Sequence, residues 1–298
     1  MSSTTAQPAS PAARARGLGR IGIWSMELRF GDSGQCGEAA AELDELGFGA
    51  VWIPGAVGGD ALGDVARLLA ATRRTVIATG ILNIWKHEPA EVGAWWAGLA
   101  DADHARLMLG LGVSHGPLIG ESYAKPLEVM SRYLDGLDAA GLPAERRCLA
   151  ALGPKMLELA AARSAGAHPY LVPPEHTALA RQRMGPSALL APEQGVILES
   201  DPGRARELAR QALAVYLPLP NYRNNWRRLG FTEAEIEGLA DRLLDALFAW
   251  GTPDQIAARA RAHLDAGADH VCLQVVHAGM ATMTPPREAW RELAKAAL

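Results

Sequence analysis

Short apolar runs alternate with helical patterns from residue 20 to the end of the chain. Eight such runs stand out, at residues 20–24, 50–54, 75–82, 106–112, 147–152, 167–172, 195–199 and 270–276. Most of them are continuous rather than alternating, which is typical of strands that are covered on both faces of a parallel sheet. The pattern therefore predicts eight buried, parallel strands.

The segments between these runs carry the spacing and the end signals of amphipathic helices. One helix is predicted to end at Gly47, another to begin at Pro89 within the segment 89–104, and a third to run from its N-cap Thr252 to Gly267. Eight repeats of strand and helix in 298 residues favour a single (β/α)8 TIM barrel over an open doubly wound sheet.

Residues 217–249 interrupt this alternation. They hold a Pro-rich turn, a segment rich in Asn and Arg, and a helix whose start pairs Thr232 with Glu235 as a capping box. We expect this inserted helical segment, near the C-terminal strands, to frame a site on the face of the βα loops; the alternative is a helix that only packs. The predicted α/β barrel domain spans residues 20–298. Residues 1–19, rich in Ser, Thr, Ala and Pro, are predicted to be a disordered tail.

Composition narrows the classes of partner. With 49% hydrophobic residues, 21% charged residues and a net charge of −4, the chain resembles an ordinary soluble globule without a basic field for nucleic acid or an anionic membrane. No apolar run reaches membrane-spanning length. We therefore expect a cytoplasmic protein with a small-molecule substrate. Cys36, Cys148 and Cys272 are far apart and are predicted to be reduced, buried thiols.

In a barrel, functional residues lie where the strands end and in the loops that follow. The clearest physical signal is at residues 149–161, where a buried strand meets Gly153, Pro154, Lys155 and an amphipathic helix. Free backbone N–H groups at such a helix start, beside a lysine, would hold an anion such as a phosphate. The alternative is an ordinary strand-to-helix turn.

The stretch 107–116 offers Gly110, Gly112, Ser114 and His115. It is not a dinucleotide fingerprint, because His115 stands where the third glycine is needed. A hydrolytic Ser–His pair is disfavoured as well, since adjacent residues seldom face one another and the elbow motif of serine hydrolases is missing. The glycines instead indicate a close approach of the backbone to a ligand.

Aromatic and histidine residues suggest a pocket rather than a metal site. Trp24, Trp52, Trp85 and Tyr170 lie at or just after predicted strands, where they could line an apolar pocket for a flat ring. The histidines lack the spacing of a ligand set, so no metal site is predicted.

Five segments, in this order, together resemble the luciferase-like monooxygenase superfamily and within it the branch that depends on the deazaflavin F420. They are residues 78–89, 107–115 with 123–137, 149–161, 166–177 and 251–276. The resemblance implies a (β/α)8 barrel with its cofactor across the C-terminal ends of the strands, and a homodimer. It also implies a non-proline cis peptide bond at Gly80–Ile81, behind the cofactor ring.

Carried over residue by residue, the resemblance places the cofactor side chain at residues 112–114 and its phosphate at residues 153–156. The full set of candidate cofactor-binding residues is Trp24, Gly80, Ile81, Leu82, Gly112, Val113, Ser114, Gly153, Pro154, Lys155, Met156 and His168.

The chain departs from the family pattern after the second strand, where Pro54, Gly55 and Ala56 replace an acidic residue and a histidine. This departure puts the alcohol-dehydrogenase chemistry of some members in doubt and leaves the proton donor open. The candidates are His115, Glu27 and His87, with His168 as a further possibility, because such side chains suit general acid catalysis. Each could instead only line the pocket.

The resemblance implies an oxidoreductase that transfers a hydride between the deazaflavin C5 and a small organic substrate. One alternative keeps the fold and uses FMN with oxygen, as a monooxygenase. A second alternative is a barrel that only binds a ligand. The long glutamate tail of F420 would favour basic residues at the rim, for which Lys125, Lys155, Arg227 and Arg228 are available.

Overall fold

A computed structural model describes residues 18–56, 58–120, 123 and 125–298. Most of the predicted tail, residues 1–17, lies outside the described residues. The strands are β1 (Ile21–Trp24), β2 (Ala50–Gly55), β3 (Val76–Asn83), β4 (Leu107–Gly112), β5 (Arg147–Leu149), β6 (Gly166–Ala167), β7 (Leu189–Leu190), β8 (Glu193–Ile197), β9 (Phe248–Trp250) and β10 (Val271–Val275).

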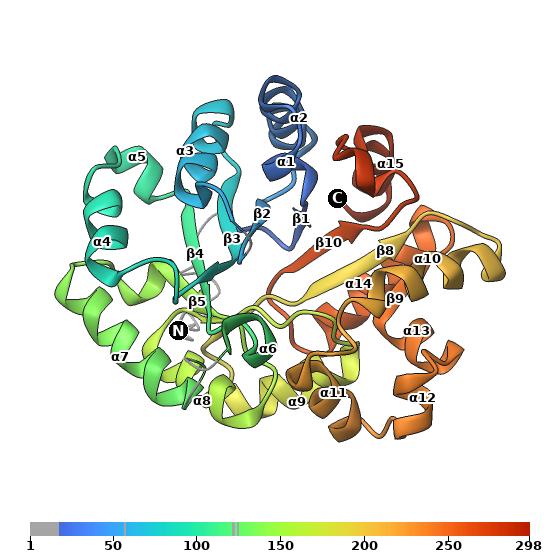
Figure 1. Cartoon of the computed structure of the whole chain (residues 1–298). Helices are drawn as coiled ribbons and strands as arrows, with labels where there is room; N and C mark the ends of the chain where they lie inside the picture. The colour runs from blue at the N-terminus through green and yellow to red at the C-terminus, as the bar shows by residue number, and fades with distance from the viewer. Residues whose placement is uncertain (1–17, 57, 121–122, 124) are drawn as a thin grey trace, which may run out of the picture.

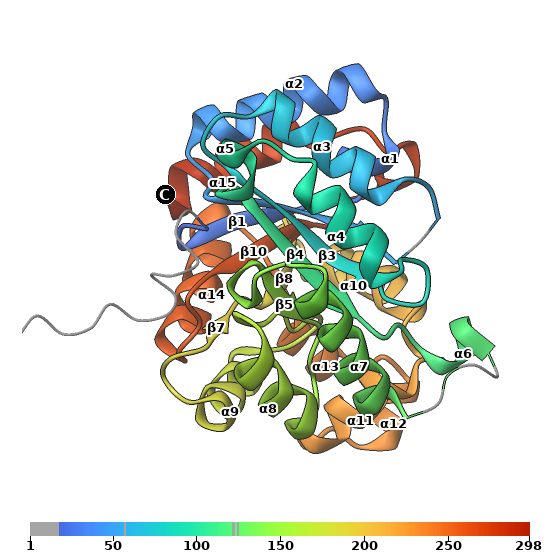
Figure 2. The same cartoon turned by 90° about the vertical axis from the view of Figure 1, so that its left-hand side faces the viewer.

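The helices are α1 (Glu27–Phe30), α2 (Ser33–Leu46), α3 (Ala61–Ala71), α4 (Pro89–Ala97), α5 (Asp101–His104), α6 (Gly116–Ile119), α7 (Pro126–Ala139), α8 (Pro154–Arg163), α9 (Pro174–Met184), α10 (Pro202–Ala214), α11 (Pro220–Arg228), α12 (Glu233–Glu237), α13 (Asp241–Leu247), α14 (Pro253–Asp265) and α15 (Arg287–Ala297). Most of them lie outside the curled sheet (Figure 1), and Figure 2 shows α2–α5 on one side of the strands, α8 and α9 on the other, and α6 beyond the strand ends.

The strands form one parallel sheet in the order β7-β6-β5-β4-β3-β2-β1-β10-β8-β9. Strands β7 and β8 are separated only by Ala191 and Pro192, yet β7 pairs with β6 while β8 pairs with β10. The backbone continues both contacts, because Ala191 N–H donates to Ala167 O (2.9 Å) and Cys272 N–H donates to Pro192 O (3.1 Å). The segment from β7 to β8 thus joins β6 on one side to β10 on the other, so the curled parallel sheet has the arrangement of the predicted TIM barrel.

Each of the eight predicted apolar runs contains a strand or overlaps one, but the lengths differ. The sixth run, 167–172, shares only Ala167 with β6, and β8, which the seventh run predicted, begins at Glu193, before the run. Strands β7 and β9 were not predicted, because they have only two and three residues and carry no pattern of their own. Strands this short are defined by their sheet partners rather than by local sequence.

The predicted helix ends are confirmed where a local capping signal marks them. Gly47 ends α2 in the left-handed region at φ +95°, Pro89 begins α4, and Thr252 forms a capping box with Gln255 at the start of α14. The segment 89–104 divides into α4 and α5, with a break after Gly98.

The insertion is more elaborate than predicted. The expected capping box of Thr232 and Glu235 starts α12, which lies between two further helices, α11 and α13. These helices share a separate apolar core around Trp226, Ile236 and Leu243, which packs beside the barrel.

The barrel interior is filled by a second apolar cluster that includes Trp24, Trp52 and Met108. The three cysteines are buried and unpaired, as predicted. Within the described ranges, none of the helices is both long and apolar enough to cross a membrane.

Candidate active site

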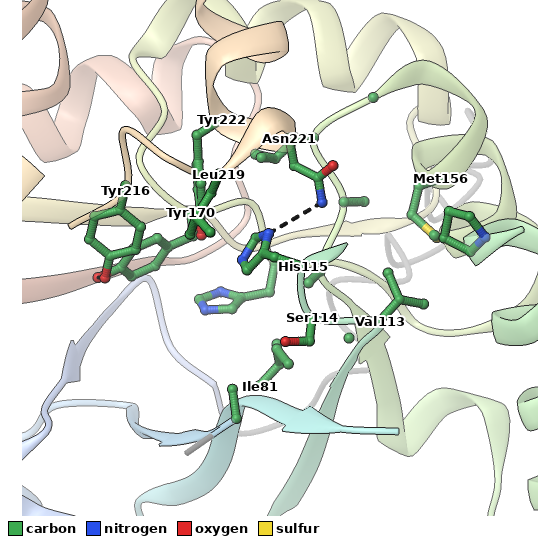
Figure 3. A pocket seen from close by; sticks show the side chains of 18 of the residues that line it. Ile81, Val113, Ser114, His115, Met156, Tyr170, Tyr216, Leu219, Asn221 and Tyr222 are labelled. Carbon is green, nitrogen blue, oxygen red and sulfur yellow. Dashed lines mark hydrogen bonds between the residues drawn. The ribbon is translucent and has the colours of Figure 1, made fainter. Parts of the chain in front are cut away.

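A cavity of about 570 Å³ opens where the strands end, between the loops that follow β1 to β6 and the insertion. This volume is in the range of small-molecule sites. Figure 3 shows side chains from the strand ends and from the insertion facing one another across it. The predicted site residues that line it are Trp24, Gly80, Ile81, Gly112, Val113, Ser114, His115, Gly153, Pro154, Lys155, Met156 and His168.

The structure does not bring Leu82, Glu27 and His87 to the cavity wall. Leu82 is fully buried in the layer between sheet and helices, because successive side chains of a strand alternate in direction. Glu27 begins α1, where its carboxylate accepts a hydrogen bond from Ser25 Oγ (2.6 Å) and lies 3.4 Å from His277 Nε2. His87 is half-buried after β3.

The floor of the cavity is formed by the end of β3. The peptide bond Gly80–Ile81 is cis, which confirms the bond implied by the family resemblance. The pairing of β3 with β4 shifts register between Ala78 and Leu82 at the same place. Trp24 Nε1 donates to Gly80 O (3.3 Å), and a methyl group on Gly80 would lie 2.3 Å from that nitrogen. Glycine is therefore required for this close contact.

His168 presents a hydrogen-bond acceptor beside this floor. Its Nδ1–H donates to Ala191 O (2.7 Å), and its ring stacks on Trp52 with centroids 4.2 Å apart. Burial lowers the pKa of His168 to about 4, so the ring is neutral near neutral pH. Its Nε2 carries a lone pair, is buried, and has no hydrogen-bond partner among the residues described.

His115 lies three residues after β4, on the side of the cavity next to the insertion. The preceding residue, Ser114, has a left-handed backbone (φ +56°), which turns the chain as it leaves the strand. Asn221 Nδ2 lies 3.3 Å from His115 Nδ1, and the Tyr222 ring is 5.2 Å from the imidazole between centroids. Burial lowers the pKa of His115. The insertion thus supplies the direct partner of this candidate catalytic residue.

Three tyrosines, Tyr170, Tyr216 and Tyr222, form an aromatic wall. Tyr170 Oη donates to Gln274 Oε1 (2.7 Å) and is 3.0 Å from Tyr216 Oη. Burial raises the pKa of Tyr216 to about 12 and raises that of Tyr170 well above its usual value, so both hydroxyls keep their protons near neutral pH. Only Tyr170 was predicted at this wall; no local signal marked the other two.

A buried carboxyl group holds the loop that carries Tyr170. Glu193 Oε2 accepts from the N–H of Leu171 (3.1 Å), whose backbone is left-handed at φ +54°. Trp226 Nε1 donates to the carbonyl of the same residue (3.4 Å). Burial raises the pKa of Glu193 to about 8. This glutamate was missed in the sequence because it lies at the start of an apolar strand.

The start of α8 forms the predicted anion-binding end of the cavity. Gly153 is the N-cap and Pro154 follows it, so the N–H groups of the first turn have no acceptor within the helix. Lys155 and Arg228 line the same end, and a methyl group on Gly153 would lie 3.7 Å from Arg228 Nη2. Arg228 donates to Asn225 Oδ1 (3.3 Å). Neither cation has a carboxylate partner in the part of the chain that the structure describes.

The two other basic candidates for the rim are engaged elsewhere. Lys125 pairs with Glu128 (3.0 Å), and Arg227 pairs with Glu233 (2.6 Å). Of the four, the structure brings Lys155 and Arg228 to the cavity. Of the other predicted aromatics, Trp52 lies beneath His168, and Trp85 donates to Val113 O behind the wall. Across the described ranges, no three His, Cys, Asp or Glu side chains converge as a metal site.

Comparison with known proteins agrees with this architecture. Residues 32–141 match the family described as Luciferase-like monooxygenase. No curated relative matches the chain. Solved structures share its fold along nearly the whole length. One is an F420-dependent secondary alcohol dehydrogenase in complex with an F420-acetone adduct, with a TM-score of 0.71 and 14% identity over 94% of this chain and 98% of that one.

Two other similar structures are monooxygenases. RslO1 from Streptomyces bottropensis has a TM-score of 0.63 and 20% identity, and covers 93% of this chain and 98% of its own. The oxygenating constituent of 3,6-diketocamphane monooxygenase from Pseudomonas putida, in complex with FMN, has a TM-score of 0.64 and 14% identity over 94% and 99% of the two chains.

The curled parallel sheet, with a cavity at the ends of its strands, defines a protein of the luciferase-like TIM-barrel fold. The match to the luciferase-like monooxygenase family covers residues 32–141 of 298, and the solved structures agree with this chain in fold along nearly its whole length. The similar structures include both F420-dependent and FMN-dependent proteins, so the comparisons leave the branch open.

Proposed function

We propose that this chain is an F420-dependent oxidoreductase that transfers a hydride between the deazaflavin and a small organic substrate. The observation that carries the proposal is the pair of cations without carboxylate partners at the start of α8, at one end of a cavity with an apolar floor. When bound, the cofactor would supply or accept the hydride at ring carbon C5. The protein would bind and orient both reactants.

The floor of the cavity fits a flat tricyclic ring. Gly112 keeps the space beside Ile81 open, since a methyl group on Gly112 would lie 2.5 Å from Ile81 Cδ1. The unpartnered Nε2 of His168 is an acceptor for the N–H of a flavin or deazaflavin pyrimidine ring, which would satisfy a buried polar atom. These features suit F420 and FMN equally.

The α8 end favours F420. Both cofactors carry a phosphate that the free N–H groups of the first turn would bind. Beyond its phosphate, F420 alone continues into a glutamate tail, whose carboxylates suit Lys155 and Arg228. An FMN-dependent monooxygenase is the second candidate, because the floor and the phosphate site would serve FMN as well. A barrel that only binds a ligand is the third.

Titration of the purified chain, first with F420 and then with FMN, tests the proposal through quenching of cofactor or tryptophan fluorescence. We expect tight binding of F420 and weak binding of FMN. The reverse order would transfer the function to an FMN-dependent monooxygenase. Binding of neither cofactor would leave only the ligand-binding role.

A further inference from the structure

We propose that Asn221 holds His115 in the tautomer with its proton on Nε2, and that this N–H group binds the carbonyl oxygen of an uncharged, largely apolar substrate. The assignment of the oxygen to a substrate rests on the proposed function. The assignment of the tautomer does not, because it follows from contacts within the protein.

The tautomer follows from the chemistry of the two side chains. The Nδ2 group of an asparagine only donates hydrogen bonds, and it lies 3.3 Å from Nδ1 of His115. Nδ1 must therefore accept, which leaves the single proton of a neutral imidazole on Nε2. Since burial lowers the pKa of His115, the neutral form prevails near neutral pH.

The position of His115 directs this proton into the cavity. The left-handed Ser114 turns the chain after β4, so the imidazole leaves the strand end and reaches the insertion. In the view of Figure 3, Asn221 approaches one ring nitrogen, and the other nitrogen is turned toward Tyr170 and Tyr222. The tilted contact with Tyr222, at 5.2 Å between centroids, fixes the plane of the ring.

The surroundings define the class of ligand. Lys155 and Arg228 are the only Lys, Arg, Asp or Glu side chains that line the cavity in the described part of the chain, and both lie at the α8 end. On the side of His115 the wall is made of Leu118, Leu219 and Tyr222. A substrate anion would find no counter-charge there, whereas a neutral N–H donor in an apolar wall matches one carbonyl oxygen.

The same hydrogen bond would matter for reactivity. When a hydride adds to the carbonyl carbon of a ketone, or to the β carbon of an enone, the π electron pair moves to the oxygen, and the resulting alkoxide or enolate then takes a proton from water. A fixed N–H donor stabilises the charged oxygen of the transition state more strongly than the uncharged oxygen of the substrate. The donor already points at this oxygen, so it does not have to reorient during the reaction. His115 keeps its proton in this role, and Asn221 is a positioning residue that acts through it.

Nitrogen-15 NMR of the histidine rings tests the tautomer in the full-length protein without any cofactor. We expect the His115 signals, assigned by their loss in His115→Gln, to show a protonated Nε2 and an unprotonated Nδ1 near neutral pH. In Asn221→Asp the carboxylate can only accept, so the proton should move to Nδ1 and the pKa of His115 should rise. Asn221→Leu, with no polar group, should give a mixture of tautomers.

A wild-type protein with the proton on Nδ1, or an Asn221→Asp protein with unchanged ring signals, would overturn the tautomer assignment. Because no cofactor is present, this failure is separate from a failure of the F420 titration.

A matched pair of ligands tests the substrate class. Cyclohexanone and methylenecyclohexane have nearly the same shape, and only the ketone accepts a hydrogen bond. We expect the full-length chain, with and without F420, to bind the ketone about five-fold more tightly, and His115→Phe to lose this preference. Equal affinities, or no binding of the ketone, would contradict the assignment of a carbonyl substrate.

Discussion

At the scale of single residues, a negative charge introduced at position 153 should prevent an anion from binding at the start of α8. Gly153→Asp places a carboxylate at the N-cap, where it would satisfy the same N–H groups and attract Arg228. The helix should remain intact, since Asp is a favourable N-cap, while the affinity for the phosphate-bearing cofactor falls by at least about 100-fold, or some 2.7 kcal/mol.

Gly153→Asn is the matched control, because it has the same shape and capping ability without the charge. Titration of both variants should show a much smaller loss in the Asn variant. If Asp and Asn weaken binding equally, sterics rather than charge act at this position. If neither changes the affinity, α8 is not part of the site.

Ser114 offers a residue-scale test of the turn that presents His115. A non-glycine residue at φ +56° is disfavoured by about 1 kcal/mol relative to glycine. Ser114→Gly should therefore be about 1 kcal/mol more stable than Ser114→Ala in urea unfolding. A more stable Ala variant would show that the backbone is not left-handed there.

At the scale of elements, Trp226 is the largest fully buried side chain that links the insertion to the barrel. Trp226 is fully buried on α11, and its Nε1 donates to Leu171 O across the boundary between insertion and barrel. Trp226→Ala should lower the free energy of unfolding by about 3–5 kcal/mol, because it leaves a large cavity and breaks that link.

Trp95→Ala on α4 is the comparison, since Trp95 is only half-buried. Urea denaturation of both variants, with limited proteolysis of residues 217–249, should show the larger loss and faster cleavage in Trp226→Ala. Equal losses would mean that α11 does not depend on this anchor.

The contrast between elements also shows what the sequence could predict. The ends at Gly47, Pro89, Thr232 and Thr252 depend on groups within one turn, so local sequence determines them. Gly153 and the loop after β4, which line the cavity, were likewise predicted from local sequence. By contrast, β9 and the site residues Asn221, Tyr216 and Glu193 depend on partners far away in the chain, and the sequence carried no signal for them.

At the scale of the whole molecule, five buried titratable groups set the pH dependence of stability. Burial lowers the pKa of His168, His176 and His270 to about 4 and that of His263 to about 3, against 6.5 for an exposed histidine. Burial raises the pKa of Glu193 to about 8, against 4.5. The histidines and Glu193 therefore change the stability of the folded chain in opposite directions as the pH rises.

Below about pH 6.5 the unfolded chain binds protons on these histidines while the folded chain does not, so stability should fall as the pH falls toward 4. Between about pH 4.5 and 8 the folded chain keeps the Glu193 proton that the unfolded chain releases, so stability should fall as the pH rises. Near pH 5.5 the four protons that the unfolded chain binds on these histidines outweigh the one that the folded chain keeps on Glu193. The free energy of unfolding should therefore rise with pH by on the order of 4 kcal/mol per pH unit. The two contributions cancel near pH 7, where stability should therefore be highest.

Urea unfolding from about pH 5 to about pH 8 checks this profile. In Glu193→Gln, whose amide oxygen can still accept from Leu171 N–H, the decline above about pH 7 should disappear, while the loss of stability toward acid pH remains. A flat profile between pH 5 and 6.5 would mean that the histidines are not buried in neutral form.

The most direct test of the central claim is the ratio of the dissociation constants of F420 and FMN, measured on the same preparation of wild-type chain. Cations at the α8 end that meet a glutamate tail should make F420 bind at least about ten-fold more tightly. Replacing Arg228 by Gln should reduce that ratio without weakening FMN comparably. An FMN affinity equal to or above that of F420 would contradict the deazaflavin assignment.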